Sequence, residues 1–396
     1  MDRQAQIDLL KRLLDYVDTK TTALAEAPWR NHVSVYTDPE HAERERQVLF
    51  RRYPLLMGFA SQWRAPGAFR TDDYAGVPIL VMRGEDGKLR AFLNVCRHRG
   101  AKVAPADGGM ARVFVCPYHA WTYDLSGQVI GIPDEGCFPG VRSERTSLTR
   151  LPLCEKHGLV WVIPTPAGED ATEFDIDSWL GGLAPELASY RFGSWAFYDR
   201  RIVPESMNWK ILVDTFHEGY HIGFLHRDSL TEVLHGNVAD FEAFCLNHRL
   251  VMPRKKLERL KSEPEEKWDL MWNTTIIYAL FPNTLLIVQG DHVELTRIFP
   301  SEGRVDRAIM DLALYVPKAP STDEERTHWD RNMQLVLDVV TGEDFPAGRT
   351  IQIGLTSGAQ THLVYGRNEP GMIHYHQSMR AVLGHPEAHA ASEAAE

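Results

Sequence analysis

Two short segments decide how this chain folds: Cys96-Arg97-His98 and, after a gap of seventeen residues, Cys116-Pro117-Tyr118-His119. Each segment offers one thiolate and one imidazole. Runs of β-forming residues precede both segments, at 91–95 and 112–115, so each is predicted to follow a strand. Loops at strand ends can face each other across a small cavity. The sequence therefore predicts a single site with two sulfur and two nitrogen ligands.

This ligand set suits either a tetrahedral zinc ion or a [2Fe–2S] cluster with mixed ligands. Zinc fingers usually keep their cysteines in one pair and their histidines in another. Here each loop is mixed, which allows both cysteines to reach one iron and both histidines the other, so we favour the cluster. The pattern resembles the Rieske centre, and this resemblance assigns the four ligands as Cys96, His98, Cys116 and His119.

Length and composition narrow the class of protein. The chain has 396 residues, 44% of them apolar and 24% charged, which is typical of a soluble globular protein with more than one domain. A net charge of −11 disfavours nucleic acid and anionic membranes as partners. No apolar run approaches the roughly 18 residues of a membrane span, and the N-terminus lacks the apolar core of a signal peptide. Three further, scattered cysteines favour a reducing, cytoplasmic location: Cys137, Cys154 and Cys245.

The spacing of apolar residues indicates an N-terminal helical segment followed by a first domain. Leucines spaced as a helical stripe predict a helix over 3–18, and residues 40–50 resemble a second one. We expect residues 1–44 to pack on the catalytic domain. Alternating patterns within 45–165 predict a small antiparallel β domain that holds both cluster loops. Its strands are expected at 78–83, 90–93, 113–115, 120–123 and 159–163.

Residues 166–383 are expected to form a larger domain, followed by a flexible tail at 384–396. Strands and helices alternate in this part of the sequence, so the fold class of the whole chain is α+β. The predicted helices cover 209–226 and 323–340. The predicted strands cover 195–203, 274–280, 284–288, 292–299 and 307–316.

A second metal site is indicated by the stretch 208–226, which has two interpretations. His217-Glu218-Gly219-Tyr220-His221 matches H-E-x-x-H, the zinc-hydrolase helix whose glutamate is the base. The alternative pairs His221 with His226. We favour the second interpretation, because a hydrolase needs no redox centre. A five-residue step turns by about 140° more than one helical turn, so the helix must bulge or unwind between these histidines, which Gly223 makes easier.

The second interpretation resembles the terminal oxygenase (alpha) subunit of the Rieske non-haem iron oxygenases, the aromatic-ring-hydroxylating dioxygenase family. The family pattern is an acid, two residues, Tyr-His, four residues and His. In this sequence only one residue separates Glu218 from Tyr220-His221, and His226 follows at the family's spacing. The resemblance implies that His221 and His226 bind a mononuclear Fe(II). It also implies a helix-grip (START-like) catalytic domain with an antiparallel sheet, preceded by the Rieske domain.

A facial triad of this kind needs one more carboxylate. The family takes it from an acidic pair about eight residues before a glutamine, and Glu343-Asp344 precedes Gln352 at that spacing. We assign Asp344 as the third iron ligand, with a helix N-cap as its structural alternative. Asp338 is the second candidate for the ligand. Asp330 is expected to be a solvated helix residue.

An acid is also expected to link the two metal sites. The resemblance implies that it hydrogen-bonds the iron ligand His221 and a cluster histidine of a neighbouring subunit, and we assign this role to Glu218. Most ring-dihydroxylating relatives carry Asp here, whereas Glu occurs in relatives that act on quaternary ammonium substrates. Asp214, one helical turn earlier, either supports a proton path or caps and solvates the helix. His217 is predicted to be structural.

The resemblance implies an oxidoreductase that incorporates O₂ into a small organic substrate by cis-dihydroxylation, monohydroxylation or oxidative demethylation. No G-x-G-x-x-G motif is present, so electrons from NAD(P)H are expected through a separate flavin reductase, a ferredoxin or both. A homotrimer is implied, with or without a beta subunit.

The substrate itself is less constrained by the sequence. A small aromatic or apolar substrate is our main expectation, and a quaternary ammonium or methylated substrate is the alternative. The zinc hydrolase is a distant alternative, and a pure electron carrier without mononuclear iron is the rival from another class. Candidate pocket residues, each more often found in a protein core, are Phe224, Met271, Trp272, Tyr278 and Leu286.

Overall fold

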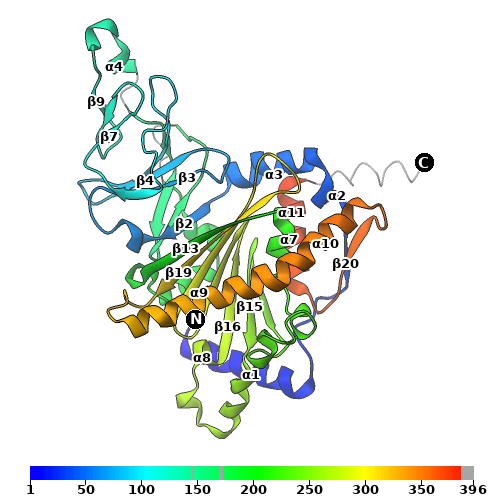
Figure 1. The fold of residues 1–396 in the computed structure, drawn as a ribbon. Coiled ribbons are helices and arrows are strands. Elements are labelled where there is room, and N and C mark those ends of the chain that lie inside the picture. Colours follow the sequence, from blue (N-terminus) through cyan, green and yellow to red (C-terminus); the bar gives the residue numbers. More distant parts are fainter. Residues whose placement is uncertain (145–146, 169–172, 385–396) are drawn as a thin grey trace. The chain divides into compact units, whose positions relative to one another are not determined.

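The structure is a computed structural model that describes residues 1–144, 147–168 and 173–384 (Figure 1). Contacts group these residues into two compact units. The first, here called the cluster unit, comprises Arg46–Trp179 and Tyr190–Ala196. The second, the catalytic unit, comprises Met1–Glu45, Leu180–Ser189 and the described residues from Phe197 onward. Apart from Gly384, the predicted tail at 384–396 lies outside the described residues.

The cluster unit is built from small antiparallel sheets, and the five strands predicted for it lie within two residues of their predicted positions. A five-stranded sheet has the order β10 (Arg150–Leu151), β5 (Leu89–Leu93), β4 (Ile79–Arg83), β3 (Ala68–Asp72) and β6 (Gly108–Met110). A three-stranded sheet joins β11 (Leu153–Lys156), β12 (Leu159–Val162) and β2 (Leu55–Phe59). Another joins β7 (Phe114–Val115), β8 (Thr122–Tyr123) and β9 (Val129–Gly131).

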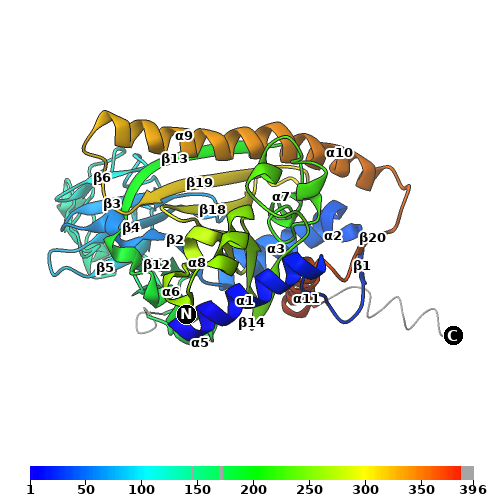
Figure 2. The ribbon, with the colours of Figure 1, turned by 90° about the horizontal axis from the view of Figure 1, so that it is seen from below.

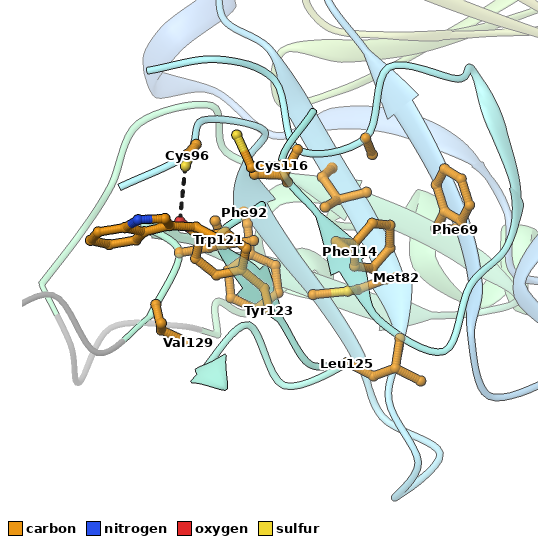
Figure 3. Packing of buried hydrophobic residues seen from close by; sticks show 14 of the residues in the cluster. Phe69, Met82, Phe92, Cys96, Phe114, Cys116, Trp121, Tyr123, Leu125 and Val129 are labelled. Atoms are coloured by element: carbon orange, nitrogen blue, oxygen red, sulfur yellow. Dashed lines mark hydrogen bonds between the residues drawn. The ribbon is translucent and has the colours of Figure 1, made fainter. Parts of the chain in front are cut away.

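Aromatic side chains form the core of this unit and pack beside the two cysteines (Figure 3). Phe92, Trp121 and Tyr123 are at most 1% exposed. Burial of each such side chain stabilises the fold by roughly 1.5–3 kcal/mol. Gly127 completes the packing, because it adopts φ +86° and a Cβ there would lie 2.4 Å from the Phe92 ring. The aromatic core therefore supports both cluster loops in a fixed position.

The catalytic unit is organised around an antiparallel sheet, as the sequence predicts. Among the described residues it has seven strands, in the order β13-β19-β18-β17-β16-β15-β14. Strands β14 to β19 follow one another as a meander, and β13 pairs beside β19. The bounds are β13 Ala196–Glu205, β14 Asp240–Phe244, β15 Asn247–Pro253, β16 Thr274–Leu280, β17 Thr284–Val288, β18 Val293–Pro300 and β19 Ala308–Val316.

Helix α9 (Asp323–Val339) runs across this sheet (Figures 1 and 2). Thr322 caps its first turn by accepting a hydrogen bond from the Glu325 backbone at 3.2 Å, and three acidic residues there suit the positive end of the helix dipole. At Val340 the helix passes into a π-helical turn, η8 (Val340–Asp344), and then into α10 (Phe345–Thr356). Such π-turns are rare and frequently occur at functional sites.

The remaining elements complete the two units. Helix α1 (Arg3–Thr19) and helix α3 (Pro39–Arg52) match their predicted positions within two residues. No helix of the described chain has the length and apolar character needed to cross a membrane. The other elements are β1 Trp29–His32, α2 Ser34–Thr37, α4 Val141–Glu144, α5 Ile176–Leu180, α6 Leu183–Ser189, α7 Trp209–Asp214, α8 Leu270–Asn273, β20 His362–Tyr365 and α11 Pro370–Leu383.

The predicted helix over 209–226 is wrong beyond its first six residues. Asn208 caps the start of helix α7 by accepting a hydrogen bond from the Lys210 backbone at 3.0 Å, and the helix ends at Asp214. The next backbone bonds connect residues three apart, which tightens and ends the helix. A short 3-10 turn, η4 (His221–Gly223), follows after a break. The two histidines predicted to bind iron therefore lie on an irregular segment, where they can point to the same place although five residues separate them.

Candidate active site

The two cluster loops are tight turns closed by their own cysteines. The Cys96 backbone N–H donates to the Ala101 carbonyl at 2.7 Å, and the Cys116 N–H donates to the Trp121 carbonyl at 2.8 Å. Gly100 ends the first loop with φ +82°, a conformation that favours glycine. This backbone requirement explains the glycine after Arg99. Each loop therefore presents its cysteine and histidine on a fixed turn.

The four predicted cluster ligands lie on these facing turns. Cys96 and Cys116 are each 3% exposed, and the His98 and His119 rings lie 4.7 Å apart between centroids. His98 also stacks on Trp121 at 5.0 Å. His119 Nδ1 is a buried atom without a hydrogen-bond partner in the described chain, so it is available as a ligand, as a cluster with two histidine ligands requires.

Tyr123 contacts the cluster site through its hydroxyl group (Figure 3). Burial and the hydrogen bond to Cys96 raise the pKa of Tyr123, so the phenol stays protonated. Its oxygen lies 3.2 Å from Cys96 Sγ and accepts a hydrogen bond from the Arg97 backbone at 2.9 Å. A protonated phenol in this position donates to the sulfur, which sequence analysis did not anticipate.

The predicted mononuclear site is assembled in the catalytic unit. His221, His226 and Asp344 offer ligand atoms that all lie within 4.8 Å of one another. Asp344 Oδ1 is 3.2 Å from His226 Nε2 and 3.8 Å from His221 Nε2. Asp344 is 5% exposed, and its Oδ1 has no hydrogen-bond partner in the described residues. Two imidazoles and one carboxylate of this kind match the donor set of a non-haem Fe(II) site.

Each histidine of this site is oriented by a carboxylate on its other nitrogen. Glu218 binds His221 Nδ1, and it also accepts the backbone N–H of His221 at 3.1 Å. Glu343 Oε2 lies 2.7 Å from His226 Nδ1 and accepts a hydrogen bond from Ser229 at 2.9 Å. These contacts leave Nε2 of both rings facing Asp344. The sequence predicts the Glu218 contact, whereas it identifies Glu343 only as a member of the acidic pair and not as a partner of His226.

The acids also explain the electrostatics of the site. Burial lowers the pKa of His226, but the nearby carboxylates of Asp344 and Glu343 outweigh burial, so the pKa is raised. The site therefore favours positive charge at the place where a metal cation would bind.

The other predicted acids lie away from this triad. Asp214 accepts a hydrogen bond from Tyr36 at 2.6 Å and lies 2.8 Å from His376 Nε2. The expectation that it caps and solvates a helix is therefore wrong, because it belongs to a buried polar network. Asp338 accepts a hydrogen bond from Gln334 at 2.7 Å, and Asp330 from Tyr198 at 2.6 Å. Neither Asp338 nor Asp330 joins the ligand group.

The zinc-hydrolase interpretation is wrong, because His217 is separated from the other ligands. Its Nδ1 lies 3.0 Å from His248 Nε2, and its ring stacks on Tyr375 at 4.4 Å. Burial lowers the pKa of His217 well below its usual value, so the ring is neutral. His217 is packed inside the fold, in agreement with its predicted structural role.

A cavity of about 400 Å³ opens beside the triad. His221, His226 and Asp344 line it together with Glu218. Apolar side chains of α9 and of the sheet form much of its wall, among them Met252, Ile277, Ile287, Leu335, Val336 and Val339. Charged and polar side chains line another part: Arg254, Gln289, Asp291, His292 and Glu294.

The predicted pocket residues were mostly wrong. Of the five, only Trp272 lines this cavity. Phe224 is 71% exposed, whereas Tyr278 and Leu286 are fully buried. Tyr278 and Leu286 are cross-strand partners of β16 and β17, whose neighbours Ile277 and Ile287 face the cavity instead. A shift of one residue along a strand reverses the face, and the sequence pattern did not fix that phase.

Comparison with known proteins supports the same class of site. The family described as "Rieske [2Fe-2S] domain" matches residues 55–148, and that described as "Ring hydroxylating alpha subunit (catalytic domain)" matches residues 192–385. The chain is 25% identical over 380 residues to the carnitine monooxygenase oxygenase subunit of Escherichia coli (strain K12), covering 90% of this chain and 94% of that protein.

The chain is also similar to a dioxygenase subunit in sequence and to a solved monooxygenase structure in fold. The chain is 33% identical over 231 residues to the biphenyl 2,3-dioxygenase subunit alpha of Rhodococcus jostii (strain RHA1). That match covers 56% of this chain and about half, 49%, of the relative. A solved structure of the quaternary ammonium Rieske monooxygenase CntA with L-carnitine has a similar fold, with a TM-score of 0.76 at 21% identity over 92% of this chain and 97% of the other.

The fold and the two ligand groups define an oxygenase that combines a Rieske cluster with a mononuclear iron. The chain belongs to the Rieske non-haem iron oxygenases, as an alpha subunit with a ring-hydroxylating-type catalytic domain. It is an oxidoreductase whose cofactors are a [2Fe–2S] cluster and a mononuclear iron. The fit of both donor sets, described above, agrees with these cofactors.

Proposed function

We propose that this chain is the oxygenase component of a Rieske monooxygenase that oxidises a small quaternary ammonium or N-methylated substrate. The observation that carries this proposal is the charged part of the cavity wall, where Arg254, Asp291 and Glu294 line the same cavity as the triad. A pocket for an aromatic hydrocarbon would leave such groups facing an apolar ligand at considerable cost. Similarity to a carnitine monooxygenase along nearly the whole chain gives independent support.

The residues of the two sites have distinct tasks in this reaction. His221, His226 and Asp344 would hold Fe(II), and the two cluster loops would hold the [2Fe–2S] group. When bound, these groups supply single electrons and the activation of O₂. Glu218 fixes His221 with Nε2 toward the triad, and Glu343 does the same for His226. The apolar cavity wall keeps water from the reacting carbon.

The overall balance of the proposed reaction follows from its products. Hydroxylation of a carbon next to the ammonium nitrogen consumes O₂, two electrons and two protons, and it forms one water. The product then loses its C–N bond to give an aldehyde, a tertiary amine and a proton. The electrons come from a separate reductase or ferredoxin. In a homotrimer, Glu218 would connect a cluster histidine of one subunit to His221 of the next, as the resemblance predicts.

A substrate comparison under ¹⁸O₂ tests this function. The purified protein with a surrogate reductase is supplied in parallel with 4-(trimethylammonio)butanoate, a trimethylammonium alcohol and biphenyl. We expect tertiary amine and aldehyde in equal amounts, with one O₂ consumed per amine, and no product from biphenyl. A biphenyl diol with two labelled atoms would overturn the proposal in favour of aromatic dihydroxylation. Three irons for every two sulfides distinguish the oxygenase from a pure electron carrier.

Glu218→Gln separates electron transfer from metal binding. The glutamine oxygen can still accept the His221 Nδ1–H, so we expect normal iron and sulfide contents with multi-turnover activity abolished. Turnover like that of the unmodified protein would remove Glu218 from the proposed connection between the sites. Asp214→Asn is the comparison variant, since Asp214 lies in the Tyr36–His376 network.

A further inference from the structure

The charged part of the cavity wall lies where four sheet strands begin or end. Arg254 follows β15, Thr275 lies at the start of β16, Gln289 follows β17 and Glu294 lies at the start of β18. Thr275 and the Arg254 guanidinium both donate to Gln289 Oε1. Gln289 Nε2 in turn donates to Glu294 at 3.3 Å, and His292 Nε2 lies 3.2 Å from the same Glu294 oxygen. These side chains form one connected network, here called the polar end of the cavity.

The polar end lies away from the triad. Asp291 is paired with His328 of α9 at 2.9 Å. His328 comes sixteen residues before Asp344, and Asn332, which also lines the cavity, comes twelve before it. More than two helical turns therefore separate Asn332 from Asp344 along α9 and η8. Leu335, Val336 and Val339 line the wall between them.

One donor of this network is unused. Arg254 Nε donates to the Thr274 carbonyl at 3.2 Å, and Nη2 donates to Gln289. Its Nη1 group has no hydrogen-bond partner among the described residues, although the side chain lines the cavity. The two anchored nitrogens hold the guanidinium in place, so the free N–H groups are already positioned for a ligand. A guanidinium so placed is well suited to a carboxylate.

The surrounding charges favour an anion. The two acids of the network, Asp291 and Glu294, are both engaged by His292 at 2.8 and 3.2 Å. Lys256 adds a further cation, with Nζ 5.1 Å from the ring centre of the cavity residue Trp272. Partial burial and the nearby Arg254 lower the pKa of Lys256, as expected where positive charge is in excess. An incoming carboxylate would relieve this excess.

We propose that Arg254 binds the carboxylate of a zwitterionic substrate, at the end of the cavity opposite the triad. The inference rests on the proposed function for the ammonium group and adds a second recognition element. It selects a trimethylammonium carboxylate over a trimethylammonium alcohol, because only the former carries an anion to pair with Nη1. With the carboxylate held at Arg254, the N-methylated end extends along the apolar wall toward His221 and His226.

Calorimetric titration of the anaerobic holoenzyme tests the proposal with matched ligands. The first pair is 4-(trimethylammonio)butanoate and its methyl ester, which differ in the carboxylate charge. The second pair is 5,5-dimethylhexanoate and its methyl ester, in which carbon replaces the ammonium nitrogen. We expect the unmodified protein to bind each carboxylate about 10- to 100-fold more tightly than its ester. Arg254→Gln should remove this preference by weakening the carboxylate and leaving the ester unchanged.

Arg259→Gln is the matched control, because Arg259 lies on the same segment, is exposed and does not line the cavity. It should keep the full preference for carboxylates. The cluster absorbance and the iron content of each variant show whether it is folded. A carboxylate preference that survives in Arg254→Gln would overturn the inference, as would a failure of both carboxylates to bind. If 5,5-dimethylhexanoate shows the Arg254-dependent preference but the ammonium compounds are not oxidised, the Arg254 site stands and the proposed function fails.

Discussion

The two metal sites of this chain are built in opposite ways. All four predicted cluster ligands come from residues 96–119, on two turns that close through their own backbone hydrogen bonds. The iron triad instead joins an irregular segment at His221 and His226 to Asp344, which follows more than a hundred residues later in a π-turn. The first site depends on local structure and a small aromatic core. The second depends on the packing of α9 across a seven-stranded sheet.

This difference predicts how each site responds to change. Damage to the long-range site should leave the local one intact, since the two lie in separate compact units. Measurement of both sites in the same sample therefore tests whether they are independent.

The largest effect is expected from Asp344→Ala. This change removes the one carboxylate of the triad. Loss of a residue that only orients a metal ligand lowers metal affinity or activity by roughly 10- to 100-fold, and loss of the ligand itself should cost more. We therefore expect turnover to fall by at least about 10³-fold. Iron should fall to two atoms per two sulfides, while the cluster spectrum stays unchanged. Iron and sulfide analysis with the visible spectrum checks this. A variant that also loses its cluster would show that the two sites are not independent.

Raising the pH should lower the free energy of unfolding of the catalytic unit, because a histidine at the polar end of the cavity loses its proton. Burial lowers the pKa of His292, but Asp291 and Glu294 outweigh burial and raise it to about 9. The protonated form is bound more tightly in the folded state, so its stabilisation is complete below about pH 6.5 and is lost as the pH rises through about 9. The shift corresponds to on the order of 3 kcal/mol.

Chemical denaturation between pH 6 and 10 measures this loss, followed by tryptophan fluorescence. His292→Gln is the control, because it removes the titrating group and should flatten that part of the profile. The charged neighbours Arg254, Asp291, Glu294 and His328 remain in both proteins. Equal slopes in the two proteins would show that another group titrates. The cluster spectrum should change little over the same range.

A smaller effect is expected from Glu343→Ala. The change removes the carboxylate that lies 2.7 Å from His226 Nδ1, so the ring is free to rotate away from Asp344. We expect iron affinity to fall by roughly 10- to 100-fold, as is usual for partners that orient a ligand. Glu343→Gln should restore most of the affinity, because its amide oxygen can still accept the hydrogen bond. Competition with a chelator measures both variants, and equal affinities for Glu343→Ala and the unmodified protein would contradict the assignment.

The same contrast explains how much could be predicted from the sequence. The four cluster ligands are predicted from the characteristic spacing of two short segments, and the structure shows that these segments form tight turns. His221, His226 and Asp344 were also predicted and are brought together, but only because the resemblance supplied their pattern. Periodicity alone predicts a helix through 226, since it cannot show that α7 ends at Asp214 or that Glu218 accepts backbone N–H groups in the irregular segment that follows.

The residues that line the cavity could not be predicted from the sequence. Arg254 belongs to a charged run that resembles a solvated segment, and only the packing of strand ends places it beside Gln289 and Glu294. Tyr278 and Leu286 were chosen on the wrong face of their strands. Side-chain direction in a sheet depends on register with neighbours, which a single sequence does not state.

The smallest effect is expected at the local site, from Tyr123→Phe. The phenol donates to Cys96 Sγ at 3.2 Å, and this hydrogen bond stabilises the reduced, more negative cluster more than the oxidised one. Loss of about 1 kcal/mol in this difference lowers the midpoint potential by roughly 40 mV. A spectroscopic redox titration measures the shift, with Tyr118→Phe as a control because Tyr118 is 56% exposed. Iron affinity at the triad should stay unchanged, and a change there would mean that the local site supports the long-range one after all.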